Sequence, residues 1–239
     1  MAETVESRDQ LLALARDGAL RGHTYRGLAL GGLSVGEAAD FGGATFERVT
    51  LAEADLRAVD LTRAVLRQVD LRSAQLDGAL GSHTSFSNCD LTEAVLANAH
   101  LEDAEIVEVS LMNCDLTRAK LVSTHFSKSN LVKARLSSAV LIKCTFSFDE
   151  RSTESMMRCD LSQATLIECD LAKANLIGAD LRGALFIKCN LNGTQLARAL
   201  VEGTQLIGCS TLGADLPPGL VAAPTLAIDL PMAELSLPR

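Results

Sequence analysis

Residues 159–181 read CDLSQATLIECDLAKANLIGADL, and a leucine returns at every fifth position of this stretch. The residues concerned are Leu161, Leu166, Leu171, Leu176 and Leu181. An amphipathic helix would space its apolar residues by three and four, and a half-buried strand would space them by two. A spacing of five fits neither element, so it predicts an internal repeat with a five-residue unit.

The same phase extends over most of the chain. Counting in steps of five from Phe41 to Leu216 gives 36 central positions, of which 33 are apolar and 30 are Leu or Phe. The position two residues earlier is Ala, Cys, Ser, Thr or Val in 34 of these units. Each unit therefore has one large and one small residue to bury, and the other three positions are expected to face water.

This pattern resembles that of the pentapeptide repeat family. The resemblance rests on the consensus Ala-(Asp/Asn)-Leu-X-X, covers residues 41–216 and implies a right-handed quadrilateral β-helix. In such a fold the chain turns a corner after each unit, so four sides make a coil of about 20 residues. We therefore predict an all-β solenoid of about nine to ten coils, with a short N-terminal helix cap and an extended Pro-rich C-terminal tail.

Three segments are expected along the chain. Residues 1–22 form an N-terminal helical cap, with the amphipathic helix at residues 5–17 and its end near Gly18. Residues 23–216 form the pentapeptide-repeat β-helix. Residues 217–239 form the tail, which holds all five prolines of the chain. Since proline has no backbone N–H to give to a ladder, the coil should end where the prolines begin.

The repeat is interrupted at residues 147–158, where Asp149 and Glu154 take the place of small inward residues. Burying an unpaired carboxylate is costly, so both of these sides are expected to protrude. We predict a distorted coil in which the interruption replaces two sides, which keeps Phe146 and Phe186 on one side of the solenoid. The alternative is a wholly excised ten-residue loop, which would rotate all later sides by half a turn.

The seven cysteines all occupy the small inward position. They are Cys89, Cys114, Cys144, Cys159, Cys169, Cys189 and Cys209. This placement predicts buried thiols that act as small apolar side chains. We expect no metal and no cofactor, and no arrangement of histidines or carboxylates in the sequence predicts a catalytic site. The chain is therefore expected not to be an enzyme.

Two surfaces are predicted to bind a partner. Ile167, Ile187 and Ile207 recur every 20 residues at an outward position, with Leu185 beside them. An exposed row of aliphatic side chains indicates a covering partner, which can be another protein, a second copy or the tail. The second surface is the protruding interruption. Its candidate residues are Asp149, Glu150, Arg151 and Glu154.

Composition limits the function further. The net charge of −8 disfavours direct nucleic-acid binding, which depends on clustered positive charge. The sequence shows neither a secretory leader nor an apolar run long enough to span a membrane, so a cytoplasmic location is expected. The resemblance implies a non-enzymatic protein–protein interaction scaffold. Two partners remain open: a component of a bacterial secretion system, which the chain would serve as an adaptor or accessory protein, or a type II topoisomerase. In the second case the chain would mimic DNA, bind DNA gyrase and confer resistance to quinolones or a toxin.

Overall fold

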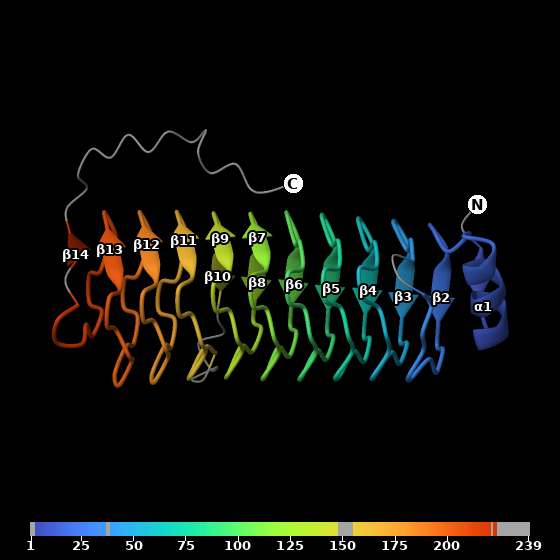
Figure 1. The fold of residues 1–239 in the computed structure, drawn as a ribbon, viewed down its shortest axis with the longest axis horizontal. Coiled ribbons are helices and arrows are strands. Elements are labelled where there is room, and N and C mark those ends of the chain that lie inside the picture. Colours follow the sequence, from blue (N-terminus) through green and yellow to red (C-terminus); the bar gives the residue numbers. More distant parts are fainter. Residues whose placement is uncertain (1–2, 37–38, 148–154, 221, 224–239) are drawn as a thin grey trace.

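The computed structural model describes residues 3–36, 39–147, 155–220 and 222–223, and it shows an elongated β-solenoid of about ten coils (Figure 1). The one helix of these ranges, α1, spans Arg8–Arg16. The strands in chain order are β1 Thr4–Val5, β2 Thr24–Arg26, β3 Thr45–Glu47, β4 Val65–Arg67, β5 Ser85–Ser87, β6 Glu105–Val107, β7 Lys120–Val122, β8 His125–Ser127, β9 Val140–Ile142, β10 Thr145–Ser147, β11 Thr165–Ile167, β12 Leu185–Ile187, β13 Gln205–Ile207 and β14 Ala222–Ala223.

These strands form two parallel sheets on neighbouring sides of the coil. The first sheet has the order β1-β2-β3-β4-β5-β6-β8-β10, and the second has the order β14-β13-β12-β11-β9-β7. In the coils that hold β7 and β8, or β9 and β10, the two strands follow each other with one corner between them. The first sheet therefore lies in the N-terminal two-thirds of the rod and the second in its C-terminal half (Figure 1).

The coil has four sides and about 20 residues, as the repeat predicts. Each side pairs with the same side of the next coil, and within one coil the four pairings share the 20-residue offset. These are Thr45↔Val65, Thr50↔Asp70, Asp55↔Gln75 and Asp60↔Leu80. Such short strands and single bridges bury little on their own, so each coil depends on its neighbours for stability.

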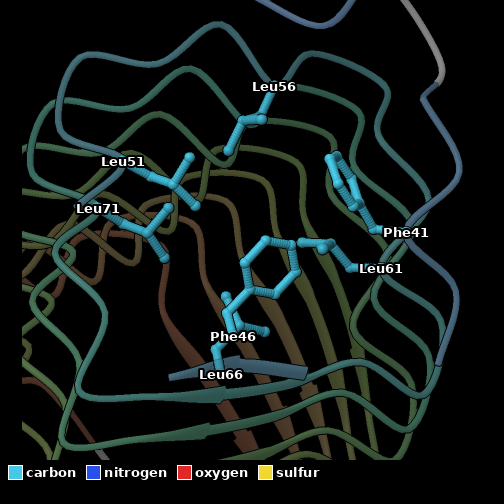
Figure 2. Close-up of a pocket in the computed structure, with 7 residues that line it drawn as sticks. All are labelled: Phe41, Phe46, Leu51, Leu56, Leu61, Leu66 and Leu71. Carbon is cyan, nitrogen blue, oxygen red and sulfur yellow. The ribbon is translucent and has the colours of Figure 1, made fainter. Parts of the chain in front are cut away.

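The interior is filled by the central residues of the repeat. Figure 2 shows seven of them pointing inward from successive sides; all seven are buried. They are Phe41, Phe46, Leu51, Leu56, Leu61, Leu66 and Leu71. The small residue two positions before each is buried as well, apart from the half-buried Ala39, which confirms the predicted division into two inward and three outward positions.

Backbone geometry explains why the small position accepts Ser, Thr and Cys. Their side chains donate a hydrogen bond to the carbonyl of a central residue in the preceding coil. Ser129 Oγ donates to the Ile106 carbonyl over 3.0 Å, and Cys189 Sγ donates to the Leu166 carbonyl over 3.3 Å. A buried polar group that keeps such a partner avoids most of its desolvation penalty.

Each corner requires one residue in the left-handed region, two positions after the central residue. Lys143 and Lys188 have φ angles of 54° and 52° there, and Gly183 has 68°. A non-glycine residue in this region costs on the order of 1–2 kcal/mol. The stacking of identical corners must offset this cost, since most of these positions are not glycine.

The N-terminal end differs from the prediction in detail. The helix begins at Arg8 and not at residue 5, because Val5 belongs to β1 and Ser7 is the N-cap, whose side chain accepts a hydrogen bond from the Gln10 N–H. Leu11 of α1 is fully buried, so the helix covers the end of the core. The first sheet starts at β1, inside the segment expected to form only a cap. Such a cover protects the end of a solenoid from edge-to-edge association.

The interruption adds five residues to one coil, so both predicted arrangements of the break are wrong. Arg135 bridges to Asp160, and β9 pairs with β11 with Leu141 opposite Leu166, so both offsets are 25 residues instead of 20. Met156, the first central residue that the structure describes beyond residue 147, is fully buried. One side's length of chain is therefore left out of the stack, and all later sides are rotated by a quarter turn.

The quarter turn separates the two phenylalanines that the 20-residue period places together. Phe146 lies in the first sheet, stacked on Phe126 with ring centroids 4.8 Å apart. Phe186 lies in the second sheet, opposite Leu166 and Leu206. The prediction that Phe146 and Phe186 share a side is therefore wrong.

Candidate functional site

The second sheet carries a continuous row of aliphatic side chains on its outer surface, which we call the apolar ladder. Its rungs follow the central residue in β7, β9, β11, β12 and β13, and they pair in register. They are Val122, Ile142, Ile167, Ile187 and Ile207. Each rung is half-buried, although its strand neighbours in the core are fully covered. The side chains thus cover one another and leave one apolar edge facing outward.

The ladder is longer than the sequence prediction. Ile167, Ile187 and Ile207 are paired as expected, and Leu185 lies on the same surface, two residues before Ile187 in β12. The structure adds Val122 and Ile142, which a 20-residue period places on another side. Aliphatic residues on both sides of Leu141 are the signal that could have found them, because the outer residues of β9, Val140 and Ile142, match those of β12.

A column of charged residues borders the ladder at the next corner. It consists of Lys143, Glu168 and Lys188, all exposed and all in the left-handed conformation. Within the described ranges, no ion pair includes any of the three. An apolar centre with a charged rim is the usual composition of a protein-binding surface.

The first sheet has an outer surface of a different kind. Its outward residues are Ser, Thr, His, Arg and Glu with few apolar members, as in Ser85 and Ser87 of β5. Charged residues pair between coils on this sheet and at the corner that follows it. On the sheet, Arg26 Nε lies 2.7 Å from Glu47 Oε2, and at the corner Lys128 Nζ lies 3.3 Å from Glu108 Oε1. Surface pairs of this type contribute only about 0–1 kcal/mol each, and they leave no apolar patch.

The acidic residues of the rod do not form a continuous negative column. The column that runs from Asp55 to Asp180 contains Gln75, Val95 and Arg135 between its aspartates. Arginines neutralise further members. Arg72 contacts Asp70 at 2.7 Å and lies 3.9 Å from Asp90. The hydrogen bonds from Arg72 hold the pKa of the Asp70 carboxyl below its ordinary value.

The interior offers no room for a ligand near the first coils. The cavity among the seven residues of Figure 2 is about 10 Å³, which is the volume that one water requires. In the described ranges, no cluster of three or more His, Cys, Asp or Glu residues is arranged to hold a metal. None of the described helices combines the length and hydrophobicity that crossing a membrane requires.

The cysteines occupy the interior as predicted. Cys89, Cys114, Cys144, Cys159, Cys169 and Cys189 are buried, and Cys209 is half-buried near the last coil. Burial raises the pKa of the Cys89 thiol to about 11 and that of the Cys159 thiol to about 12. Thiols that stay protonated at neutral pH are poor nucleophiles and poor metal ligands.

The second predicted surface cannot be placed. Asp149, Glu150, Arg151 and Glu154 lie outside the described residues. Their part in binding a partner remains a prediction from the sequence.

Comparisons with known proteins agree with this geometry. A family model described as pentapeptide repeats matches residues 50–80, 82–118, 110–147 and 155–193, in 8 copies. No curated protein sequence matches the chain significantly.

Solved structures of similar fold cover more than four-fifths of the chain. One is HetL, a pentapeptide repeat protein involved in heterocyst differentiation regulation in the cyanobacterium Nostoc, with 21% identity, a TM-score of 0.55, and coverage of 87% of this chain and 98% of that one. Another is a trypsin-treated form of QnrB1, a plasmid-mediated fluoroquinolone resistance protein, with 19% identity, a TM-score of 0.58, and coverage of 83% and 91%. At such identities the likeness concerns the fold alone.

Proposed function

Because this chain belongs to the pentapeptide repeat family, we propose that it is a non-enzymatic scaffold that binds another protein through the side of its coil that carries the apolar ladder. The stacked coils supply a stiff support, and a repeat scaffold can vary its outward residues without changing its core. The protein's activity then depends on what one side presents to a partner.

The observation that carries this proposal is the ladder itself. Ile142, Ile167, Ile187 and Ile207 share one outer surface, whereas the first sheet presents polar residues at the equivalent positions. The rungs are half-buried, and together they present one continuous apolar edge bordered by charges, a composition that fits an interaction site. The ladder would form the centre of the interface and Lys143, Glu168 and Lys188 part of its rim.

Of the two candidate partners, the surface charges favour an adaptor role in a bacterial secretion assembly over binding to a type II topoisomerase. A DNA mimic needs closely spaced negative charge along the rod, as in the phosphate backbone it replaces. Here arginines pair with Asp55, Asp70 and Asp180, and polar or basic residues interrupt the acidic columns. Either partner would place the chain in a bacterial cytoplasm.

Affinity capture from the source cells tests the proposal. Immobilised wild-type protein is compared with Ile187→Lys, which places a charge in the ladder, and with Ser87→Lys, its matched control in the first sheet. We expect a defined protein to be retained by the wild type and the control, and to be retained at least about tenfold less by Ile187→Lys, since central apolar contacts dominate binding energy. Equal retention by all three proteins would contradict the proposal.

The topoisomerase alternative has a separate test. A gyrase supercoiling assay with micromolar protein, with and without ciprofloxacin, should show neither inhibition nor protection. Inhibition that survives Ile187→Lys would establish the alternative partner and an interface away from the ladder.

A further inference from the structure

The C-terminal segment of the chain leaves the described structure at the end of the apolar ladder. β14 pairs with β13 so that Ala223 lies opposite Ile207, the last rung. Pro224 follows at once and, lacking an N–H, cannot extend the parallel ladder. Residues 224–239 therefore start beside the rung from which the ladder runs back toward β7.

The sequence of this segment fits an apolar strip. It reads PTLAIDLPMAELSLPR, and Leu226, Ile228, Leu230 and Met232 alternate with smaller or polar residues. In an extended chain, alternate residues share one face. This period of two occurs outside the five-residue repeat and indicates a segment with one apolar face and no coil of its own.

The length of this segment and the area of the ladder favour the segment, over a second copy of the chain, as the occupant of the ladder. From β13 to β7 the ladder spans four steps between strands, or about 19 Å, and each strand is about 10 Å long, which makes a face of about 190 Å². A stable complex of separate proteins buries about 800 Å² on each partner. The ladder alone is too small for a symmetric dimer, and a separate partner protein would also have to bury the charged rim around it. A tethered segment has no such requirement, because its effective concentration is about millimolar.

We propose that residues 224–239 fold back over the apolar ladder and cover it until a partner displaces them. The 16 residues of the segment reach about 53 Å when extended, more than twice the length of the ladder. Asp229 and Glu234 of the segment are complementary to Lys143 and Lys188 at the rim. This inference rests on the proposed function, since it regulates access to the same site.

The first test compares surface exposure with and without the segment. A chain that ends at Ala223 keeps β14, and its binding of the dye ANS is measured against the full-length protein. We expect fluorescence to rise at least about threefold, because ANS binds exposed apolar surface. Ile187→Lys in the shortened chain should remove most of the rise, whereas Ser87→Lys should not. Equal fluorescence of the full-length and shortened chains would overturn the proposal.

A second variant avoids any effect of truncation on folding. Leu226→Ser, Ile228→Ser and Leu230→Ser together keep the full length and remove the apolar face of the segment. This variant should bind ANS like the shortened chain. A synthetic peptide of residues 224–239 should bind the shortened chain and reverse the rise, and a scrambled peptide should not. Binding of the peptide that is unchanged by Ile187→Lys would place it elsewhere and contradict the proposal.

The outcomes separate this inference from the proposed function. If residues 224–239 cover the ladder but Ile187→Lys captures the same proteins as the wild type, the scaffold proposal fails. The proposal that the segment covers the ladder then still stands. If the ladder captures a partner equally well in the full-length and shortened chains, the cover fails and the scaffold proposal stands. A full-length chain that is dimeric by light scattering and becomes monomeric with Ile187→Lys would show that a second copy occupies the ladder, and it would overturn the cover.

Discussion

Two halves of one side of the coil share a core and differ in their surface. In the N-terminal half, the outward positions after the central residue are Thr62, Ser82 and Glu102; further along the same side they become Ile142 and Ile167. The central residues behind both are buried, including Gly81, which stands where a large residue is usual. The inward pattern therefore specifies the solenoid, and the outward positions are free to define a binding surface.

The backbone of the two halves also differs in its pairing between coils. The polar half of this side forms only isolated bridges, such as Asp60↔Leu80 and Leu80↔His100, whereas the apolar half forms the strands of the second sheet. β-branched and aliphatic residues favour extended chain when they pack on their neighbours across strands. The aliphatic residues of the ladder therefore favour strands over isolated bridges, and they also present apolar area to the outside.

The largest effect is expected from changing the register between the two halves. Deleting Asp149–Thr153 removes five residues and restores a 20-residue coil, so the solenoid should fold with its ladder intact. Deleting ten residues, Ser147–Met156, removes a buried central residue and leaves a coil too short to close four sides. Far-UV circular dichroism and thermal melting should show a native-like first variant and loss of the C-terminal coils in the second. Equal tolerance of both deletions would show that the coil at the interruption does not need four complete sides.

The next effect tests whether the two cores are equivalent. Leu71 and Leu176 are both fully buried central residues, one before and one after the interruption. Replacing either with Ala should lower the free energy of unfolding by about 2–5 kcal/mol, because a buried leucine leaves a cavity. Urea denaturation measures the loss, and hydrogen exchange shows which coils open first. A large loss at one position only would break the equivalence of the two cores.

The sequence predicts which residues form the core better than it predicts how the sides after the interruption are rotated relative to those before it. Central residues such as Leu161 and Leu171 are buried as expected because the five-residue phase decides which side chains point inward. That phase is preserved by any insertion that is a multiple of five. The count alone therefore cannot tell whether the interruption removes no side, one side or two sides from the stack, and only the pairing of Leu141 with Leu166 decides it.

The same ambiguity limited the prediction of the candidate site. Ile167, Ile187 and Ile207 follow the interruption and keep one register, so their alignment could be read from the sequence. Val122 and Ile142 precede it, and they join the ladder only through the quarter turn. The positive φ angles at the corners were also missed, since lysine and glutamate there mask the preference that glycine would show.

A smaller effect concerns two buried thiols, Cys159 after the interruption and Cys89 before it, whose pKa values burial raises. The pKa of Cys159 is about 12 in the folded chain and about 8.5 when unfolded. Below pH 8.5 the Cys159 thiol makes its full contribution to the free energy of unfolding. This contribution is lost as the pH rises toward 12, since only the unfolded state ionises in that range. From pH 8 to pH 10 this single group should lower the free energy of unfolding by about 2 kcal/mol.

Comparison with Cys159→Ala isolates this contribution, because other groups that titrate in this range are common to both proteins. The variant should lose less stability over the same pH interval in urea titrations. Cys89→Ala provides the matched measurement in the N-terminal half, where the folded pKa is about 11. Identical pH profiles for the wild type and both variants would mean that these thiols are solvated.

The smallest effect is expected from exchanging outward residues between the two halves. Glu102→Ile places an aliphatic residue beside Val122 on the polar half of the side, and Ile187→Thr shortens the ladder between Ile167 and Ile207. Each cross-strand contact contributes about 0.2–1 kcal/mol, so the first variant should gain this amount and the second should lose it. Chemical denaturation measures both, with Ser87→Thr in the first sheet as the neutral control. Because these changes are small beside those of Leu71→Ala, the solenoid can alter its outer surface at little cost in stability. A loss of several kcal/mol in Ile187→Thr would instead show that the ladder belongs to the core.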